Sequence, residues 1–78
     1  MATIHDKALK ELRDYLDTHV HGWQTKVSAL VGKTRNLVHM VSKGERRNDA
    51  VIEAMLTIAE QHKQRVRSME DRIKELAA

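Results

Sequence analysis

The stretch SKGERRND, residues 42–49, lies between two long runs of helical sequence and decides how they are connected. Gly44 suits the left-handed position just beyond a helix end, where a residue with a Cβ atom is strained. Asn48 or Asp49 can cap a following helix, because its side-chain oxygen accepts hydrogen bonds from free N–H groups of the first turn. A linker over residues 44–47 is short enough for antiparallel neighbours. The stretch therefore predicts a turn that folds one helix back along another.

The run after the turn has the heptad pattern of a coiled-coil helix. Its seam positions alternate in spacing between three and four residues, as positions a and d of a heptad do. Charged and polar residues fill the positions between them, which is typical of a helix with one solvated side. The pattern predicts a helix over residues 48–77. Its seam consists of Ile52, Met55, Ala59, His62, Val66, Met69, Ile73 and Leu76.

The run before the turn is longer and has a different period. Its apolar stripe repeats about every eleven residues, or ~3.67 residues per turn. Such a stripe runs almost straight along the helix or coils around it with a weak right-handed twist. Gly22 and Gly32 lie inside it, and each costs up to ~1 kcal/mol relative to alanine in a helix. Because the stripe keeps its phase across Gly22, we expect one long helix over residues 4–43. The alternative is a break near Gly22, which would give a three-helix bundle.

Composition favours an all-α fold in a single domain over residues 1–78. The chain has no proline and only three glycines, and it is rich in residues that favour helices. The two runs then form a long antiparallel, coiled-coil-like helical hairpin. Its arms differ in length, at about 40 and about 30 residues, or ~60 Å and ~45 Å. The longer arm would therefore leave Ile4, Leu9 and Leu12 uncovered.

Self-association would cover such apolar residues. A domain this small needs a further source of stability, and the absence of cysteine excludes disulfides. We therefore expect a homodimer that forms a four-helix bundle. The residues expected in its core or its dimer interface are Leu9, Leu12, Leu16, Trp23, Val27, Ile52, Met55, Val66, Met69, Ile73 and Leu76.

Basic residues gather in the middle of the chain. The chain carries a net charge of +3, and residues 22–47 hold six basic residues against Glu45 alone. A solvated turn explains part of this cluster. An acidic protein partner is a second interpretation, and a nucleic acid is a third, because clustered cations release counterions from phosphates. The candidate partner-binding residues are Lys33, Arg35, Lys43, Arg46 and Arg47.

Residues for catalysis or for a bound cofactor are missing from the sequence. None of the five histidines forms a pair with the i, i+4 spacing of a helical zinc site, and the hairpin register places His62 far from His19 and His39. His62 at a seam position is then either an edge residue or a polar residue of the interface that sets the register or responds to pH. We expect no catalytic residues, no metal site and no cofactor, and hence no enzyme.

The functions that remain are those of proteins that act by binding. No apolar run reaches the length of a membrane span, and the first residues lack an apolar signal region, so we expect a cytoplasmic protein that does not insert into membranes. The sequence favours a small regulatory or adaptor protein that binds a partner protein through its apolar stripe and its basic hairpin end. The alternative is a basic helical hairpin that binds nucleic acid.

Overall fold

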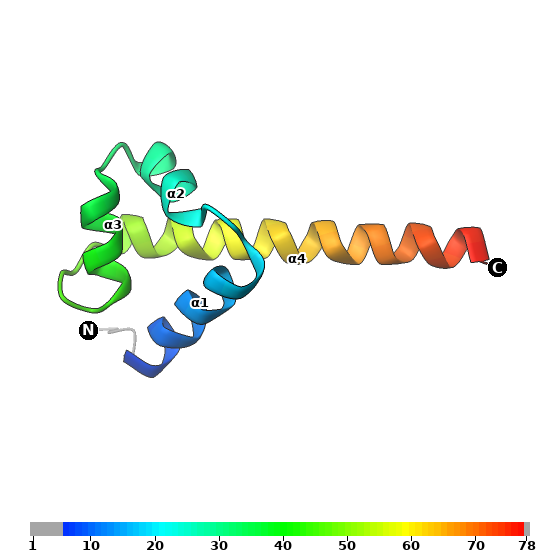
Figure 1. Cartoon of the computed structure of the whole chain (residues 1–78), viewed down its shortest axis with the longest axis horizontal. Coiled ribbons are helices and arrows are strands. Elements are labelled where there is room, and N and C mark those ends of the chain that lie inside the picture. The colour runs from blue at the N-terminus through cyan, green and yellow to red at the C-terminus, as the bar shows by residue number, and fades with distance from the viewer. Residues whose placement is uncertain (1–5, 78) are drawn as a thin grey trace.

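The computed structural model describes residues 6–77, and over that range the chain forms four α-helices and no strands (Figure 1). The all-α prediction is confirmed. Helices α1 to α3 each contact α4 and gather around its first half, while the second half projects away from them. The described residues span 49 × 25 × 20 Å. The helices are α1 (Asp6–His19), α2 (Trp23–Val31), α3 (Arg35–Ser42) and α4 (Asp49–Ala77).

The expected single helix over residues 4–43 is wrong, because α1, α2 and α3 take its place. Gly22 and Gly32 have φ angles of 72° and 67°, in the left-handed region that a right-handed helix cannot contain. Thr34 then starts α3, and its side-chain oxygen accepts a 3.2 Å hydrogen bond from the Leu37 backbone N–H. The alternative of a break near Gly22 is confirmed, although the second break at Gly32 makes the fold one of four helices. The expected start at residue 4 lies outside the described residues.

The turn before α4 has the predicted geometry. Gly44 has a φ angle of 82°. Its N–H donates to the Val41 carbonyl at 3.0 Å and the Glu45 N–H donates to the Met40 carbonyl at 2.9 Å, which together make a Schellman motif. Asn48 caps α4, since its Oδ1 accepts a 3.3 Å hydrogen bond from the Val51 N–H. α4 begins within one residue of its predicted start, but α3 lies across α4 and does not run back along it as the hairpin prediction required (Figure 1).

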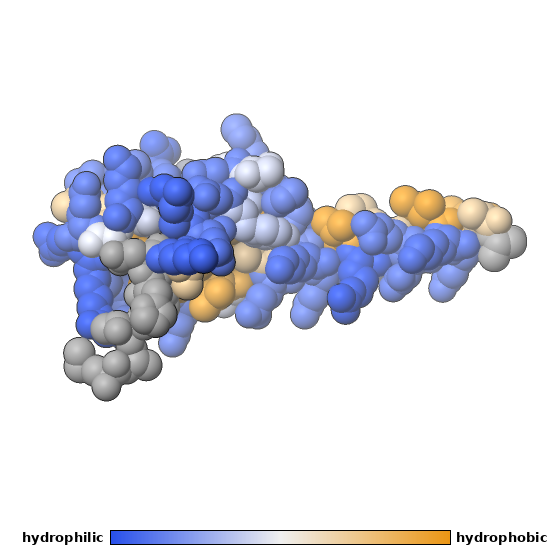
Figure 2. Space-filling model, turned by 90° about the horizontal axis from the view of Figure 1, so that it is seen from below, coloured by the Kyte–Doolittle hydropathy of each residue, from blue (hydrophilic) through white to orange (hydrophobic). Residues whose placement is uncertain are grey.

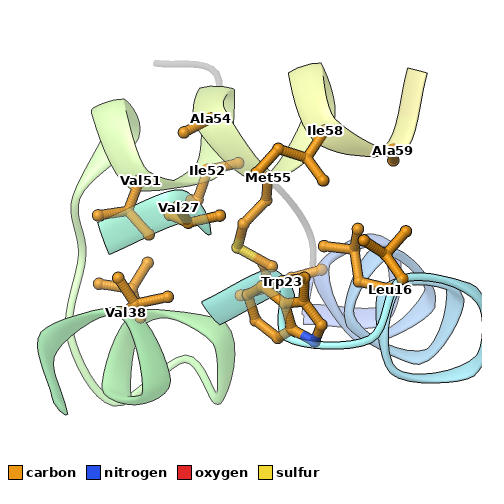
Figure 3. Close-up of a cluster of buried hydrophobic side chains, with 13 residues drawn as sticks. Leu16, Trp23, Val27, Val38, Val51, Ile52, Ala54, Met55, Ile58 and Ala59 are labelled. Atoms are coloured by element: carbon orange, nitrogen blue, oxygen red, sulfur yellow. The ribbon is translucent and has the colours of Figure 1, made fainter. Parts of the chain in front are cut away.

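Side chains from all four helices form one hydrophobic core (Figure 3). Met55 points from α4 toward Trp23 of α2. Trp23 is only 3% exposed, and its Nε1 donates a 2.8 Å hydrogen bond to Asp17 Oδ1, so its polar atom is satisfied at the edge of the core. The fully buried large side chains are Leu16, Val27, Val38, Val41, Val51 and Met55.

The core covers only part of the α4 seam. Ile52, Met55 and Ala59 are buried, whereas no residue of α4 beyond Ala59 is. We call residues 49–62 the proximal segment and residues 63–77 the distal segment. Three short helices that fold back on one another reach along the proximal segment and leave most of the distal segment uncovered (Figure 1). The expected pairing of one long helix along all of α4 is thus absent from the described chain.

Candidate interaction surfaces

An exposed apolar stripe runs along the distal segment of α4. It consists of Val66, Met69, Ile73 and Leu76, which we call the distal stripe. Val66 is half-buried at the edge of the core, and the exposed fraction then rises from 48% at Met69 to 64% at Ile73 and 89% at Leu76. Figure 2 shows hydrophobic side chains along one side of this projecting part and hydrophilic ones along the other. The second half of the predicted seam is therefore open to solvent.

The sequence explains why the distal segment stays helical without packing. Its residues are good helix formers, and glycine and proline are absent from it. Glu70 precedes Lys74 by four residues, which is the favourable order for a charge pair on a helix surface. Local interactions thus support the distal segment, while tertiary packing supports the proximal one.

A cluster of aromatic and basic side chains marks the junction between the two segments. A 3.0 Å hydrogen bond joins the Tyr15 hydroxyl and His62 Nδ1. The ring centroids of His19 and His62 lie 5.9 Å apart in a stacked arrangement, and Lys63 Nζ lies 5.1 Å from the centroid of the Tyr15 ring. We call Tyr15, His19, His62 and Lys63 the junction cluster. With Val66, Arg67 and Glu70 it lines an open hollow of about 320 Å³.

The junction cluster corrects the position predicted for His62. The hairpin register placed His62 far from His19, but the break at Gly22 makes α1 a separate helix whose end lies against α4. At its seam position the His62 ring packs against Tyr15 and His19 of α1, and its Nδ1 is hydrogen-bonded to the Tyr15 hydroxyl. Among residues 6–77 no group of three or more His, Cys, Asp or Glu side chains could hold a metal ion. The cluster therefore joins the end of α1 to the middle of α4.

The five predicted basic residues are all exposed, but they lie at different places. Lys33 and Arg35 lie where α3 begins, and Lys43, Arg46 and Arg47 lie where it ends. The eight residues of α3 separate the two groups by about 12 Å along the helix. Arg47 Nε lies 3.9 Å from Asp49 Oδ1, a solvated ion pair.

Sequence reasoning missed two basic residues that join Lys43. Lys10 and Arg13 of α1 line a hollow of about 220 Å³ together with Leu9, Ser42, Lys43 and Gly44. A continuous first helix would have carried Lys10 and Arg13 far from the turn at Gly44. The breaks at Gly22 and Gly32 bring α1 back to this end of the molecule instead. We call Lys10, Arg13 and Lys43 the basic hollow.

The described residues show no further site with unusual chemistry. Every buried side-chain nitrogen or oxygen within them has a hydrogen-bond partner. No helix in the described part of the chain is long and apolar enough to cross a membrane. No model of a protein family, no curated protein and no solved structure matches the chain.

Proposed function

We propose that this protein is a non-catalytic adaptor or regulator that works by binding other protein chains. The distal stripe is the observation that carries the proposal. Contiguous exposed apolar side chains on a soluble domain mark an interaction surface, because leaving them in water forgoes their burial. Met69, Ile73 and Leu76 follow one another along a single helix face and are each at least 48% exposed. The proposed site is this face.

The spacing of the stripe indicates how a partner binds. Residues three and four apart on a helix form a narrow apolar seam, which fits against another helix or into an apolar groove. Arg65, Glu70 and Arg72 flank the seam and are exposed. Charged residues at such positions select the partner and its orientation. A helical partner with a matching seam is thus the best fit.

The basic residues supply a second proposed contact, for an acidic protein. Lys10 and Arg13 come from α1, Lys43 comes from the turn that follows α3, and all three line one hollow. Like charges held together repel one another, and an acidic surface relieves that repulsion. Arg46 and Arg47 follow Lys43 along the exposed turn before α4. This part of the surface is where an acidic partner would bind.

The basic hollow also favours nucleic acid as the alternative partner, because phosphates bind to the same arrangement of cations. Single-stranded nucleic acids additionally use exposed aromatic rings as stacking platforms. The aromatic residues of this chain are Trp23, which is 3% exposed, and Tyr15, which is half-buried against His62. The protein partner is therefore the better supported of the two.

A photo-crosslinking experiment tests the proposed site. A photoreactive amino acid replaces Ile73 on the stripe or, as the matched control, Asp71 on the opposite side of the same helix. We expect adducts with protein from native lysate at position 73 that survive nuclease treatment, and far fewer at position 71. Equal adducts at both positions would contradict the proposal.

A charge-reversal variant tests the basic contact separately. Arg46 and Arg47 are replaced by glutamate, and the variant is compared with wild type in a pull-down with and without nuclease. We expect the fold to be unchanged, because both side chains are exposed, and acidic partners to be lost. Recovery of proteins only when nuclease is omitted would favour the nucleic-acid alternative.

A further inference from the structure

We infer that the chain which binds the distal stripe is a second copy of this protein, aligned antiparallel, so that the end of each α4 lies against the junction cluster of the other. This inference rests on the proposed function, since it names the partner of the same site. The head denotes α1, α2, α3 and the proximal segment.

The position of the head excludes a parallel pair. The buried seam residues of the proximal segment and the exposed residues of the distal stripe belong to one heptad series. A heptad series drifts only about 20° around a straight helix per repeat. The head therefore lies on the same side of α4 as the stripe. Paired helices lie about 8–10 Å apart, and in a parallel pair both heads would have to fit between them.

An antiparallel pair avoids this conflict, because each head lies beyond the end of the other chain's α4. It also permits only one register with full contact. Val66 is the first seam residue beyond the junction cluster, so it pairs with the partner's Leu76, and Met69 pairs with the partner's Ile73. A shift of one heptad toward the head would bring the partner's Leu76 to Ala59, which is buried. A shift of one heptad the other way would leave only half of the contacts between described residues.

The layers of this register are well matched in shape. Each one places a β-branched side chain, Val66 or Ile73, against a longer one, Leu76 or Met69. The tip of α4 reaches the open hollow of about 320 Å³ that Tyr15, His19, His62 and Lys63 help to line. The last carbonyl groups of a helix carry a partial negative charge. Lys63 and Arg67 at the hollow are therefore favourable neighbours for the partner's helix end.

The flanking charges also agree with the antiparallel register. Glu70 lies near the level of the partner's Lys74 on one side of the seam, and Arg65 lies near the partner's Glu75 on the other. The twofold axis repeats both pairs. Glu70 also approaches the partner's Glu70 and Arg72 approaches the partner's Arg72, which weakens the pairing. On each helix Lys74 follows Glu70 by one turn and Glu75 follows Arg72 by one turn. Each pair of like charges therefore has opposite charges beside it.

The contact is short, so we expect a weak dimer. It spans about 12 residues, or ~18 Å of each helix, which is small beside the interfaces of obligate dimers. The two heads then lie at opposite ends of the assembly. Each presents its own basic hollow, with Lys10, Arg13 and Lys43, so one dimer can contact two acidic surfaces that lie apart.

Sedimentation equilibrium tests whether the stripe forms the dimer. We expect the average mass of wild type to rise from that of a monomer toward that of a dimer between about 10 μM and about 1 mM, as a Kd on the order of 100 μM requires. Ile73→Glu is expected to stay monomeric throughout. Gln64→Glu adds the same charge on the opposite side of α4 and is expected to behave like wild type. A wild type that stays monomeric, or a dimer that survives Ile73→Glu, would overturn the inference.

Disulfide capture tests the orientation, and the chain suits it because it has no cysteine of its own. The single variants Val66→Cys and Leu76→Cys are mixed and oxidised, and mass spectrometry separates the products. Random pairing would make half of the disulfide-linked dimers mixed ones, which join one chain of each variant. We expect the mixed fraction to be larger than that. An excess of self-linked products would indicate a parallel pair and overturn the inference.

The two proposals can fail separately. If wild type is monomeric but position 73 still captures other proteins, the stripe is a binding site and its partner is not a second copy. If position 73 captures neither another protein nor a second copy of the chain, both proposals fail.

Discussion

Met55 and Met69 occupy the same heptad position of one helix, two repeats apart, yet Met55 is fully buried and Met69 is 48% exposed. The same contrast separates Ile52, which is 8% exposed, from Ile73, which is 64% exposed. Heptad periodicity selects the side of a helix that is apolar, and both segments of α4 obey it. Periodicity does not say what covers that side. In the proximal segment it is the rest of the chain, and in the distal segment we propose that it is another chain.

The reason for the difference lies in the first half of the sequence. A single helix over that half would have lain along most of α4 and buried both segments. The left-handed glycines at positions 22 and 32 divide it into three short helices instead. These helices pack on one another as well as on α4, and the apolar residues that would have covered the distal segment are used in the head.

Hydrogen exchange should show the largest difference between the two segments. Amides of residues 51–59 open only when the head unfolds, whereas those of residues 66–76 belong to a helix without packing, which is marginal at this length. For a global stability of about 5 kcal/mol the distal amides should exchange roughly 1,000-fold faster. The measurement is mass spectrometry of peptides at a low chain concentration. Equal protection in both segments would mean that the distal segment is packed in the monomer.

A matched pair of methionine substitutions should show the next largest effect. Met55→Ala leaves a cavity beneath Trp23 and should cost about 2–4 kcal/mol. In a domain of this size that lowers Tm by about 10–25 °C. Met69→Ala removes the same atoms from an exposed position and should cost under about 0.5 kcal/mol. The fluorescence of Trp23 reports both melts, and similar losses would contradict the assigned burial.

Gly32→Ala tests why only the proximal segment is covered. No atom lies within 4 Å of a Cβ built at Gly32, so the cost comes from its φ angle of 67° alone. We expect a loss of about 1–2 kcal/mol, because alanine is strained in the left-handed region. Within a continuous helix the same substitution would stabilise the protein by up to ~1 kcal/mol. The sign of the change in a urea melt therefore distinguishes three short helices from one long one.

Tyr15→Phe at the junction should have the smallest effect. It removes the 3.0 Å hydrogen bond to His62 and should cost about 0.5–1 kcal/mol, the usual net value for such a bond. His39→Ala, which truncates an exposed histidine on α3, is the control and should leave Tm within 1 °C or so of wild type. If the two variants have the same Tm, the junction cluster does not contribute to holding α1 against α4.

Much of the candidate interaction surface could be predicted, but not its accessibility. The residues of the distal stripe follow from the heptad spacing, and the basic residues around Gly44 follow from the charge distribution. That Lys10 and Arg13 lie beside Lys43, and that His19 meets His62, could not be derived from spacing. Each of these contacts depends on the combined angles of two loops between segments far apart in the sequence.

The sequence contained a local signal for the breaks at Gly22 and Gly32, namely the glycines themselves, but the continuous apolar stripe indicated the opposite. Glycine tolerates the left-handed region at positions 22 and 32 as readily as at position 44. The apolar stripe that continues in phase across them favoured an unbroken helix. Such a stripe is compatible with either structure, since it specifies which side chains are buried and leaves the path of the backbone open.

The sequence by itself determined the all-α class, the start and length of α4, the cap at Gly44 and the side of α4 that is apolar. These features depend on residues close together in the chain, whose propensities and hydrogen bonds are local. Only the tertiary structure decided that Met55 is buried and Met69 is exposed, because burial depends on where α1, α2 and α3 come to lie. Their packing is the sum of many weak contacts between distant segments, and no single stretch of the sequence contains it.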